Sequence, residues 1–433
     1  MNQLSGKKLC NRKQFLSYMG LGLISSSALP GFSSSSHTND KSFPAMNTNS
    51  YPIPRRNLNA ATEQKESKFY PTPDNPKKRT GYAIVGLGKL TLGNILPAFA
   101  SCKHSKVVAL VSGDAQKASN VADQYGIDPK NIYNYQNFDS IKDNKEIDAV
   151  YIVLPNSMHH EFTLRAAAAG KHVLCEKPMA NSVQESEEMI EACKKADRKL
   201  MIAYRVQYEP NNKMIMEWIR NKEYGTVKHI ELFNGQNIGD PTQWRLKKSL
   251  AGGGALVDIG IYCLNTCRYL LGEEPDSVAA SIHSTPGDDR FKEVEESIFF
   301  QLRFPSGVTA NCASSYGAHQ SRRYRVYSEE AWFGMDPAFP YKGLKTEFSQ
   351  ANDNVEWKSN PSIPEADQFA LEIDHFTQCI QHDLKPFTPG EEGLQDHKIM
   401  QAIYRSATEQ KVIKLDTFSE SDVFRGPKPK GEE

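Results

Sequence analysis

The chain has 433 residues, which at the usual domain size predicts two or three domains. Its 52 Lys and Arg residues balance 52 Asp and Glu residues, and this zero net charge argues against a nucleic-acid binder, which normally carries a basic excess. Hydrophobic residues make up 39% of the chain, and no run reaches the roughly 18 apolar residues of a membrane-spanning helix. We therefore predict a soluble, multi-domain protein with no nucleic-acid partner and no membrane embedding.

Residues 1–35 have the three parts of an export signal. Four Lys and Arg residues lie between positions 7 and 13, a short apolar stretch covers 18–24, and small residues follow. The segment Asn-Arg-Lys-Gln-Phe-Leu at 11–16 resembles a twin-arginine (Tat) signal with Lys13 in place of the second arginine. This pattern predicts export to the periplasm. The alternative is a basic tail on a cytoplasmic protein.

Residues 36–80 form a polar, proline-rich segment that includes Tyr51-Pro-Ile-Pro54 and Tyr70-Pro-Thr-Pro73. Such a segment lacks the apolar content to fold alone, and alternating prolines favour an extended chain. We interpret it either as a linker or as an N-terminal arm laid across another surface.

From residue 81 to residue 205, expected strands and helices alternate. The expected strands cover 82–85, 106–111, 148–154 and 171–175, and the expected helices cover 92–100, 115–125 and 162–169. This alternation predicts an α/β domain with a parallel sheet and helices on both faces, the Rossmann arrangement.

Gly86-Leu87-Gly88 joins the first expected strand to the first expected helix. Backbone N–H groups at such a helix start can hold the pyrophosphate of a dinucleotide. The third glycine of the GxGxxG pattern would stand at position 91, which is Thr91. Many turns contain a lone GxG, so its position directly after the first strand is what predicts a dinucleotide site.

The end of the second expected strand discriminates NAD from NADP. That position holds Ser112, then Gly113, with Lys117 five residues after Ser112. A hydroxyl, a backbone N–H and a cation suit a 2′-phosphate, which a carboxylate would repel. Asp114 argues the other way, and Ser112 and Lys117 also fit an ordinary helix cap and a solvated helix position. We predict NADP.

Three further segments complete a pattern. They are Leu154-Pro-Asn-Ser-Met-His-His160, Cys175-Glu-Lys-Pro-Met179 and Ala251-Gly-Gly-Gly-Ala-Leu-Val-Asp-Ile-Gly-Ile-Tyr262. Together with the glycine turn and Tyr204-Arg205, they resemble the Gfo/Idh/MocA oxidoreductase family over residues 81–275, and less specifically to about residue 410. The stretches 109–113, 243–246 and 269–275, the leader and the arm are similar to the glucose–fructose oxidoreductase subgroup of that family.

Oxidising a sugar hydroxyl requires loss of a hydride to nicotinamide and of a proton to a base. Lys177 follows a strand at the carboxyl edge of the sheet, where such sheets bind ligands. Asp258 and Tyr262 are four apart on an expected helix and would share one face, Asp258 orienting the sugar and Tyr262 taking the proton. Many members of the family carry His at the position of Tyr262. A phenol needs a nearby cation to ionise, and Lys177 is the expected one. The alternative is a core Tyr262 and a surface Asp258.

The resemblance implies a cofactor site built from strand ends and from the segment around residue 244. Its members are Gly86, Leu87, Gly88, Lys89, Leu90, Ser112, Lys117, Tyr135, Leu154, Asn156, His159, Glu176, Lys177, Arg205, Trp244 and Arg245. Weaker candidates are Tyr204, Tyr208 and Tyr341, because tyrosines pack against sugars but also fill cores. The adjacent His159 and His160 would point about 100° apart on a helix. They have no acidic partner at ligand spacing, so we predict no metal site.

The second half of the chain, residues 206–420, shows few helices between its expected strands. Those strands cover 229–233, 277–282, 296–303, 308–313, 325–327 and 331–334, followed by expected helices at 368–381 and 394–408. This order predicts an α+β domain with a large, mostly antiparallel open sheet. An open sheet in this family packs against another subunit, so we expect a homodimer or homotetramer.

The resemblance implies an exported sugar oxidoreductase that keeps NADP tightly bound. In a ping-pong cycle, glucose would leave as gluconolactone, and fructose would then enter the same site and leave as sorbitol. One alternative is an ordinary NAD(P)-dependent sugar or polyol dehydrogenase that releases its cofactor. The other is a non-catalytic regulator that binds NADP or a sugar, although such a protein would be expected to have lost Lys177 or Tyr262.

Overall fold

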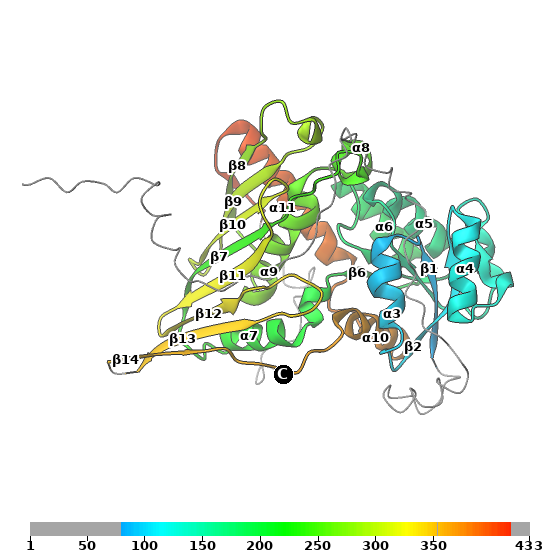
Figure 1. The fold of residues 1–433 in the computed structure, drawn as a ribbon, viewed down its shortest axis with the longest axis horizontal. Coiled ribbons are helices and arrows are strands. Elements are labelled where there is room, and N and C mark those ends of the chain that lie inside the picture. Colours follow the sequence, from blue (N-terminus) through cyan, green and yellow to red (C-terminus); the bar gives the residue numbers. More distant parts are fainter. Residues whose placement is uncertain (1–78, 353, 417–433) are drawn as a thin grey trace, which may run out of the picture. The chain divides into compact units, whose positions relative to one another are not determined.

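The computed structural model describes residues 79–352 and 354–416. The predicted export signal and nearly all of the predicted N-terminal arm lie outside the described residues. Within these residues the chain forms a six-stranded sheet and a nine-stranded sheet, each with helices packed against it (Figure 1).

The six-stranded sheet has the order β3-β2-β1-β4-β5-β6, and all its neighbouring strands run parallel. The strands are β1 (Thr80–Val85), β2 (Ser105–Val111), β3 (Ile132–Tyr133), β4 (Ala149–Ile152), β5 (His172–Glu176) and β6 (Leu200–Ala203). The connecting helices include α3 (Leu96–Ala98), α4 (Ala115–Tyr125), α5 (His159–Ala168) and α6 (Val183–Lys195). The order reverses between β1 and β4, where doubly wound sheets place their ligands. The predicted Rossmann arrangement is confirmed.

Strand β1 shows why the strands of this sheet are continuous apolar runs in the amino-acid sequence. Ala83 and Val85 pack into one core, whereas Tyr82 and Ile84 pack into a second core on the other face. A strand that is buried on both faces is mainly apolar at every position, as expected for a parallel sheet. The second core also contains Ile373 and Phe376 of helix α10 (Gln368–Gln381). These residues were predicted to belong to the second domain, but α10 packs against the six-stranded sheet.

The nine-stranded sheet has the order β14-β13-β12-β11-β7-β10-β9-β8-β15. Its strands are β7 (Val227–Gly235), β8 (Ser277–His283), β9 (Ser297–Arg303), β10 (Thr309–Ser315), β11 (Ser321–Ser328), β12 (Ala331–Met335), β13 (Thr346–Asn352), β14 (Val355–Ser359) and β15 (Ile413–Lys414). Among its described strand pairs, β7 and β10 are parallel and the others antiparallel. The predicted α+β sheet is confirmed, although the sequence pattern missed β13, β14 and β15.

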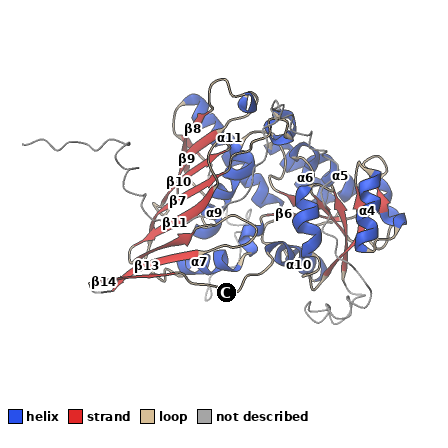
Figure 2. Ribbon diagram, in the orientation of Figure 1, coloured by secondary structure: helices blue, strands red, loops and turns tan. Residues whose placement is uncertain are grey.

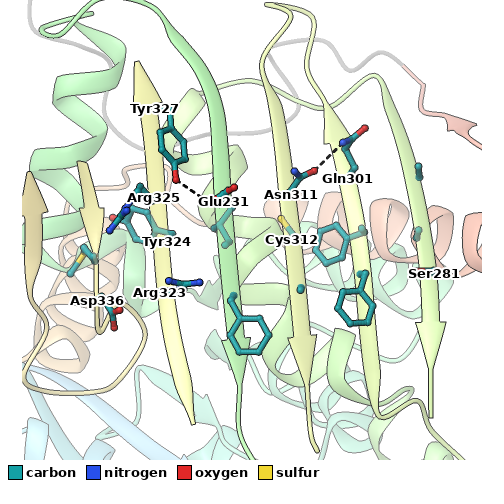
Figure 3. A pocket seen from close by; sticks show the side chains of 18 of the residues that line it. Glu231, Ser281, Gln301, Asn311, Cys312, Arg323, Tyr324, Arg325, Tyr327 and Asp336 are labelled. Atoms are coloured by element: carbon teal, nitrogen blue, oxygen red, sulfur yellow. Dashed lines mark hydrogen bonds between the residues drawn. The ribbon is translucent and has the colours of Figure 1, made fainter. Parts of the chain in front are cut away.

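Among the described residues, helices cover one face of this sheet and leave the other open. Helices α9 (Ile261–Leu271) and α11 (Gly390–Glu409) pack against the covered face, and α7 (Pro210–Arg220) packs against α9 (Figure 2). On the open face, Gln301 donates a hydrogen bond to Asn311 at 2.9 Å, and Tyr327 donates to Glu231 at 3.0 Å (Figure 3). Exposed and buried residues alternate along β9, which gives the sheet one apolar and one mixed face.

The helical stretch Lys248–Leu271 is long and apolar enough to cross a membrane by length and composition alone. However, 78% of its most apolar window is buried inside the fold, as in the core helix of a globular domain. The described cysteines are all buried and none forms a disulfide.

Candidate active site

A cavity of about 730 Å³ extends from the carboxyl edge of the six-stranded sheet to the ends of β7 and β11. Apart from His159, all the predicted catalytic and cofactor-binding residues line it. Of the three weaker tyrosine candidates, Tyr341 lines this cavity and the other two do not. The fold therefore brings together residues that are spread over more than 170 positions of the sequence.

The glycine turn forms one end of this cavity. Gly86 has φ +99°, and a Cβ atom there would lie 2.3 Å from the carbonyl oxygen of Val153. A Cβ atom on Gly88 would meet open space. The Thr91 hydroxyl donates to the Gly86 carbonyl at 2.7 Å and so closes the turn where the pattern expects a third glycine. A π-helical turn, η2 (Thr91–Ile95), starts there in place of the regular helix predicted at 92–100.

The end of β2 holds the residues expected to choose between NAD and NADP. Asp114, rather than Ser112, is the N-cap of α4, and its carboxylate accepts the backbone N–H of Lys117 at 2.9 Å. The Lys117 ammonium lies 3.7 Å from the same carboxylate, which offsets its charge. The Ser112 hydroxyl accepts the backbone N–H of Asp114 at 3.1 Å and can still donate a hydrogen bond. The Tyr135 ring packs against Gly113 at this end of the cavity.

His159 lies behind the cavity and not on its wall. It is fully buried, with Nδ1 2.9 Å from the Pro178 carbonyl and Nε2 2.9 Å from the Leu154 carbonyl. Burial lowers the pKa of this imidazole. His159 thus holds the loop after β4 against the loop after β5, and the structure does not place it where we predicted a cofactor contact. Asn156 does line the cavity and donates to the Ala251 carbonyl at 2.8 Å.

Lys177 and Asp258 meet at the other end of the cavity. The Lys177 ammonium donates to the Asp258 backbone carbonyl at 2.6 Å and lies 3.4 Å from Oδ1 of its side chain. The Tyr316 hydroxyl donates to Oδ2 of Asp258 at 2.8 Å, and Nε of Arg245 lies 3.1 Å from the same oxygen. Burial alone would raise the pKa of Asp258, but Arg245, Lys177 and the Tyr316 hydrogen bond together lower it to about 2. The carboxylate therefore stays ionised and can accept hydrogen bonds from a substrate.

The backbone around Asp258 differs from the predicted regular helix. Asp258 belongs to a π-helical turn, η8 (Leu256–Gly260), and Tyr262 stands in the first turn of α9. The Lys177 ammonium lies 4.6 Å from the centroid of the Tyr262 ring, whereas Nη2 of Arg205 donates to the Tyr262 hydroxyl at 3.2 Å. Lys177 was the expected cation beside this hydroxyl; the residue that contacts it in the structure is Arg205.

Arg205 is held in place by two segments that lie far from it in the sequence. Its Nη1 donates to Oε1 of Gln368 at 2.5 Å, and its Nη2 donates to the Phe339 carbonyl at 2.7 Å. Arg245 pairs with Asp258 and also stacks on Trp244, with its guanidinium carbon 4.6 Å from the ring centroid. Both arginines were predicted as cofactor contacts, and both lie against the predicted catalytic residues.

A buried acid pair lies behind Lys177. The Tyr151 hydroxyl donates to Oε1 of Glu176 at 2.8 Å and lies 3.4 Å from Oε1 of Glu372 on α10. Burial raises the pKa of both carboxyl groups. Four residues of the site were not predicted, because nothing in the local sequence pattern marks them: Tyr151, Glu372, Gln368 and Tyr316. Among the residues that the structure describes, no group of three or more His, Cys, Asp or Glu side chains could hold a metal ion.

Comparisons with known proteins agree with this geometry. The family model described as oxidoreductase family, NAD-binding Rossmann fold, matches residues 80–204, and the model of the GFO/IDH/MocA C-terminal domain matches residues 213–334. A D-xylose 1-dehydrogenase [NADP(+)] from Haloarcula marismortui is 33% identical over 355 residues, covering 79% of this chain and 94% of the relative.

Solved structures give the same result. The crystal structure of an aldose-aldose oxidoreductase from Caulobacter crescentus complexed with glycerol is 46% identical with a TM-score of 0.75, covering 78% of this chain and 100% of the other. A levoglucosan dehydrogenase in complex with NADH is 21% identical, with a TM-score of 0.69 over 78% of this chain and 100% of the other, and supports the fold alone.

Proposed function

The chain belongs to the Gfo/Idh/MocA family and is an NAD(P)-dependent oxidoreductase that acts on sugars, and from this premise we propose that it couples the oxidation of one sugar to the reduction of another through tightly held NADP. The observation that carries the proposal is the single cavity, with the glycine turn at one end and Lys177, Asp258 and Tyr262 at the other. The expected couple is glucose to gluconolactone and fructose to sorbitol. The likeness to an aldose-aldose oxidoreductase supports a second aldose as the alternative hydride acceptor.

The residues at the glycine turn fit a dinucleotide. Gly86 has a positive φ that favours glycine, and a Cβ on Gly88 would meet open space. The following helical turn starts close to Gly88, and the backbone N–H groups at such a start can bind a pyrophosphate. Ser112 can donate to a 2′-phosphate, and Lys117 lies on the same wall with its ammonium 3.7 Å from the Asp114 carboxylate. Bound NADP would supply the hydride acceptor for one sugar and the hydride donor for the next.

The chain's own side chains supply binding and proton transfer. Lys177 directs two contacts to Asp258, which leaves its third ammonium proton for the oxygen of the reacting hydroxyl. The ionised Asp258 carboxylate would accept a hydrogen bond from a sugar hydroxyl and fix the ring. Tyr262 would take the proton of the reacting hydroxyl as its C–H bond breaks and the carbonyl forms. It would return that proton to the carbonyl oxygen of the second sugar.

The first experiment is to purify the mature protein, remove free nucleotide by gel filtration, denature it and measure released NADP(H) by absorbance. Stoichiometric NADP that an aldose reduces and a second sugar reoxidises is the expected result. A protein that emerges empty but reduces added NADP with a sugar would contradict the coupled reaction and favour the ordinary dehydrogenase. Retained NADP that responds to no sugar would favour the non-catalytic regulator. A Lys177→Met variant should retain NADP but lose the response.

We also propose export and self-association. The predicted signal at 1–35 supports export, and cell fractionation of the full chain would test it. On the open face of the nine-stranded sheet the large apolar side chain of Phe299 is 48% accessible, which supports an interface with a second copy. Light scattering of the wild type and of Phe299→Glu tests this; a monomeric wild type would contradict it.

A further inference from the structure

We propose that Arg205 is the cation that stabilises the ionised form of Tyr262, and that Gln368 is the positioning residue that holds Arg205 at this hydroxyl. The inference rests on the proposed role of Tyr262 as the proton acceptor.

The contact between Arg205 and Tyr262 has only one possible direction. A guanidinium carries donors and no acceptor and remains protonated in proteins, so the phenolic oxygen must accept this bond. A donated hydrogen bond and a nearby positive charge both favour the phenolate over the phenol. The Tyr262 oxygen keeps a lone pair, or its proton, for the cavity that the side chain lines. Arg205 therefore acts on the oxygen that would receive the substrate proton.

Lys177 contributes less directly to the same oxygen. Its ammonium faces the Tyr262 ring and makes two contacts with Asp258. Within the described part of the chain, no hydrogen bond joins this ammonium to the Tyr262 hydroxyl. The groups around Tyr262 also include Tyr341 from the loop after β12. The charged and titratable groups that face Tyr262 or Arg205 are therefore Lys177, Asp258, Tyr341, Glu176 and Glu372. Among these, the Asp258 carboxylate is already held by Arg245 and by the Tyr316 hydroxyl.

Gln368 fixes the direction of the guanidinium. The side chain is only 1% exposed, its Oε1 accepts from Nη1 of Arg205, and its Nε2 donates to the Tyr341 carbonyl at 2.8 Å. The Phe339 carbonyl accepts from Nη2 and completes the clamp. A neutral amide holds Arg205 without offsetting its charge, whereas a carboxylate at the same place would form an ion pair and draw the positive charge away from Tyr262.

The test uses the holoenzyme and two readouts. The first is the pH dependence of single-turnover sugar oxidation, followed at the reduced-nicotinamide absorbance. The second is the tyrosinate ultraviolet titration, taken as wild type minus Tyr262→Phe, which needs no turnover. Arg205→Lys and Gln368→Glu should each move the acidic midpoint of the rate profile and the tyrosinate midpoint upward, by about one pH unit. Gln378→Glu adds the same charge at an exposed position of the same helix and should leave both midpoints unchanged.

The outcomes separate this inference from the proposed function. If Tyr262→Phe keeps full activity, Tyr262 is not the proton acceptor and the proposed function loses its base, whatever Arg205 does. If Tyr262→Phe is inactive but Arg205→Lys and Gln368→Glu only lower the rate or the melting temperature, with both midpoints at the wild-type pH, the inference is wrong. If either variant fails to fold, the other decides, and Gln368→Ala, which frees Arg205 without adding a charge, provides the further measurement.

Discussion

Replacing Tyr316 by Phe removes one hydroxyl from the group that holds Asp258 ionised. That hydroxyl is buried and donates to Oδ2 of Asp258 at 2.8 Å, and the ring has space for the isosteric Phe. A hydrogen bond to a charged group contributes about 1.5–3 kcal/mol, so we expect the free energy of unfolding to fall by that amount at neutral pH. At about 1.4 kcal/mol per pKa unit, the pKa of Asp258 would rise from about 2 by about one to two units.

The effect on stability must depend on pH in a defined direction. The pKa of Asp258 is lower in the folded protein than its ordinary value of about 3.9, so its ionisation stabilises the fold above about pH 4. This contribution is lost as the pH falls through about 2, where the folded carboxyl group takes up its proton. The difference between wild type and Tyr316→Phe should therefore be full at neutral pH and should narrow in acid.

Chemical denaturation at a series of pH values between neutral and acid measures this difference. Tyr269→Phe is the matched control, because the Tyr269 hydroxyl is buried in α9 and has no hydrogen-bond partner among the described residues. It should cost little stability at any pH. If Tyr316→Phe is as stable as wild type at neutral pH, or if its deficit is the same in acid, then the Tyr316 hydroxyl does not help to hold Asp258 ionised.

Three further changes test other parts of the site. Lys177→Met should lower single-turnover oxidation by about 100- to 10,000-fold while NADP stays bound, and unchanged oxidation would remove Lys177 from the mechanism. Gly86→Ala should cost about 1–3 kcal/mol, measured by thermal unfolding, because of its positive φ and the close Val153 carbonyl; an unaffected melting temperature would argue against this turn. Lys117→Glu should weaken NADP binding about tenfold in calorimetry and leave NAD binding unchanged, whereas equal losses would contradict a 2′-phosphate contact.

The elements that the sequence predicted correctly depend on residues that are close together in the chain. The strand at 82–85 and the helix at 115–125 follow from apolar runs and periodicity, and the structure has them as β1 and α4. The turn at Gly86 follows from a positive φ, a local backbone conformation that favours glycine. The family motifs likewise placed Lys177, Asp258 and Tyr262 on one cavity.

The sequence by itself therefore determined the two sheets, the dinucleotide turn and the residue types available for chemistry. Only the tertiary structure decided their partners. Arg205 reaches Tyr262 across 57 positions and Gln368 across 163, and Tyr316 reaches Asp258 across 58. The tertiary structure also places His159 behind the cavity, between the Pro178 and Leu154 carbonyls. Propensity and spacing act over a few residues, whereas these contacts depend on how strands, loops and helix α10 pack together, and no local pattern encodes that packing.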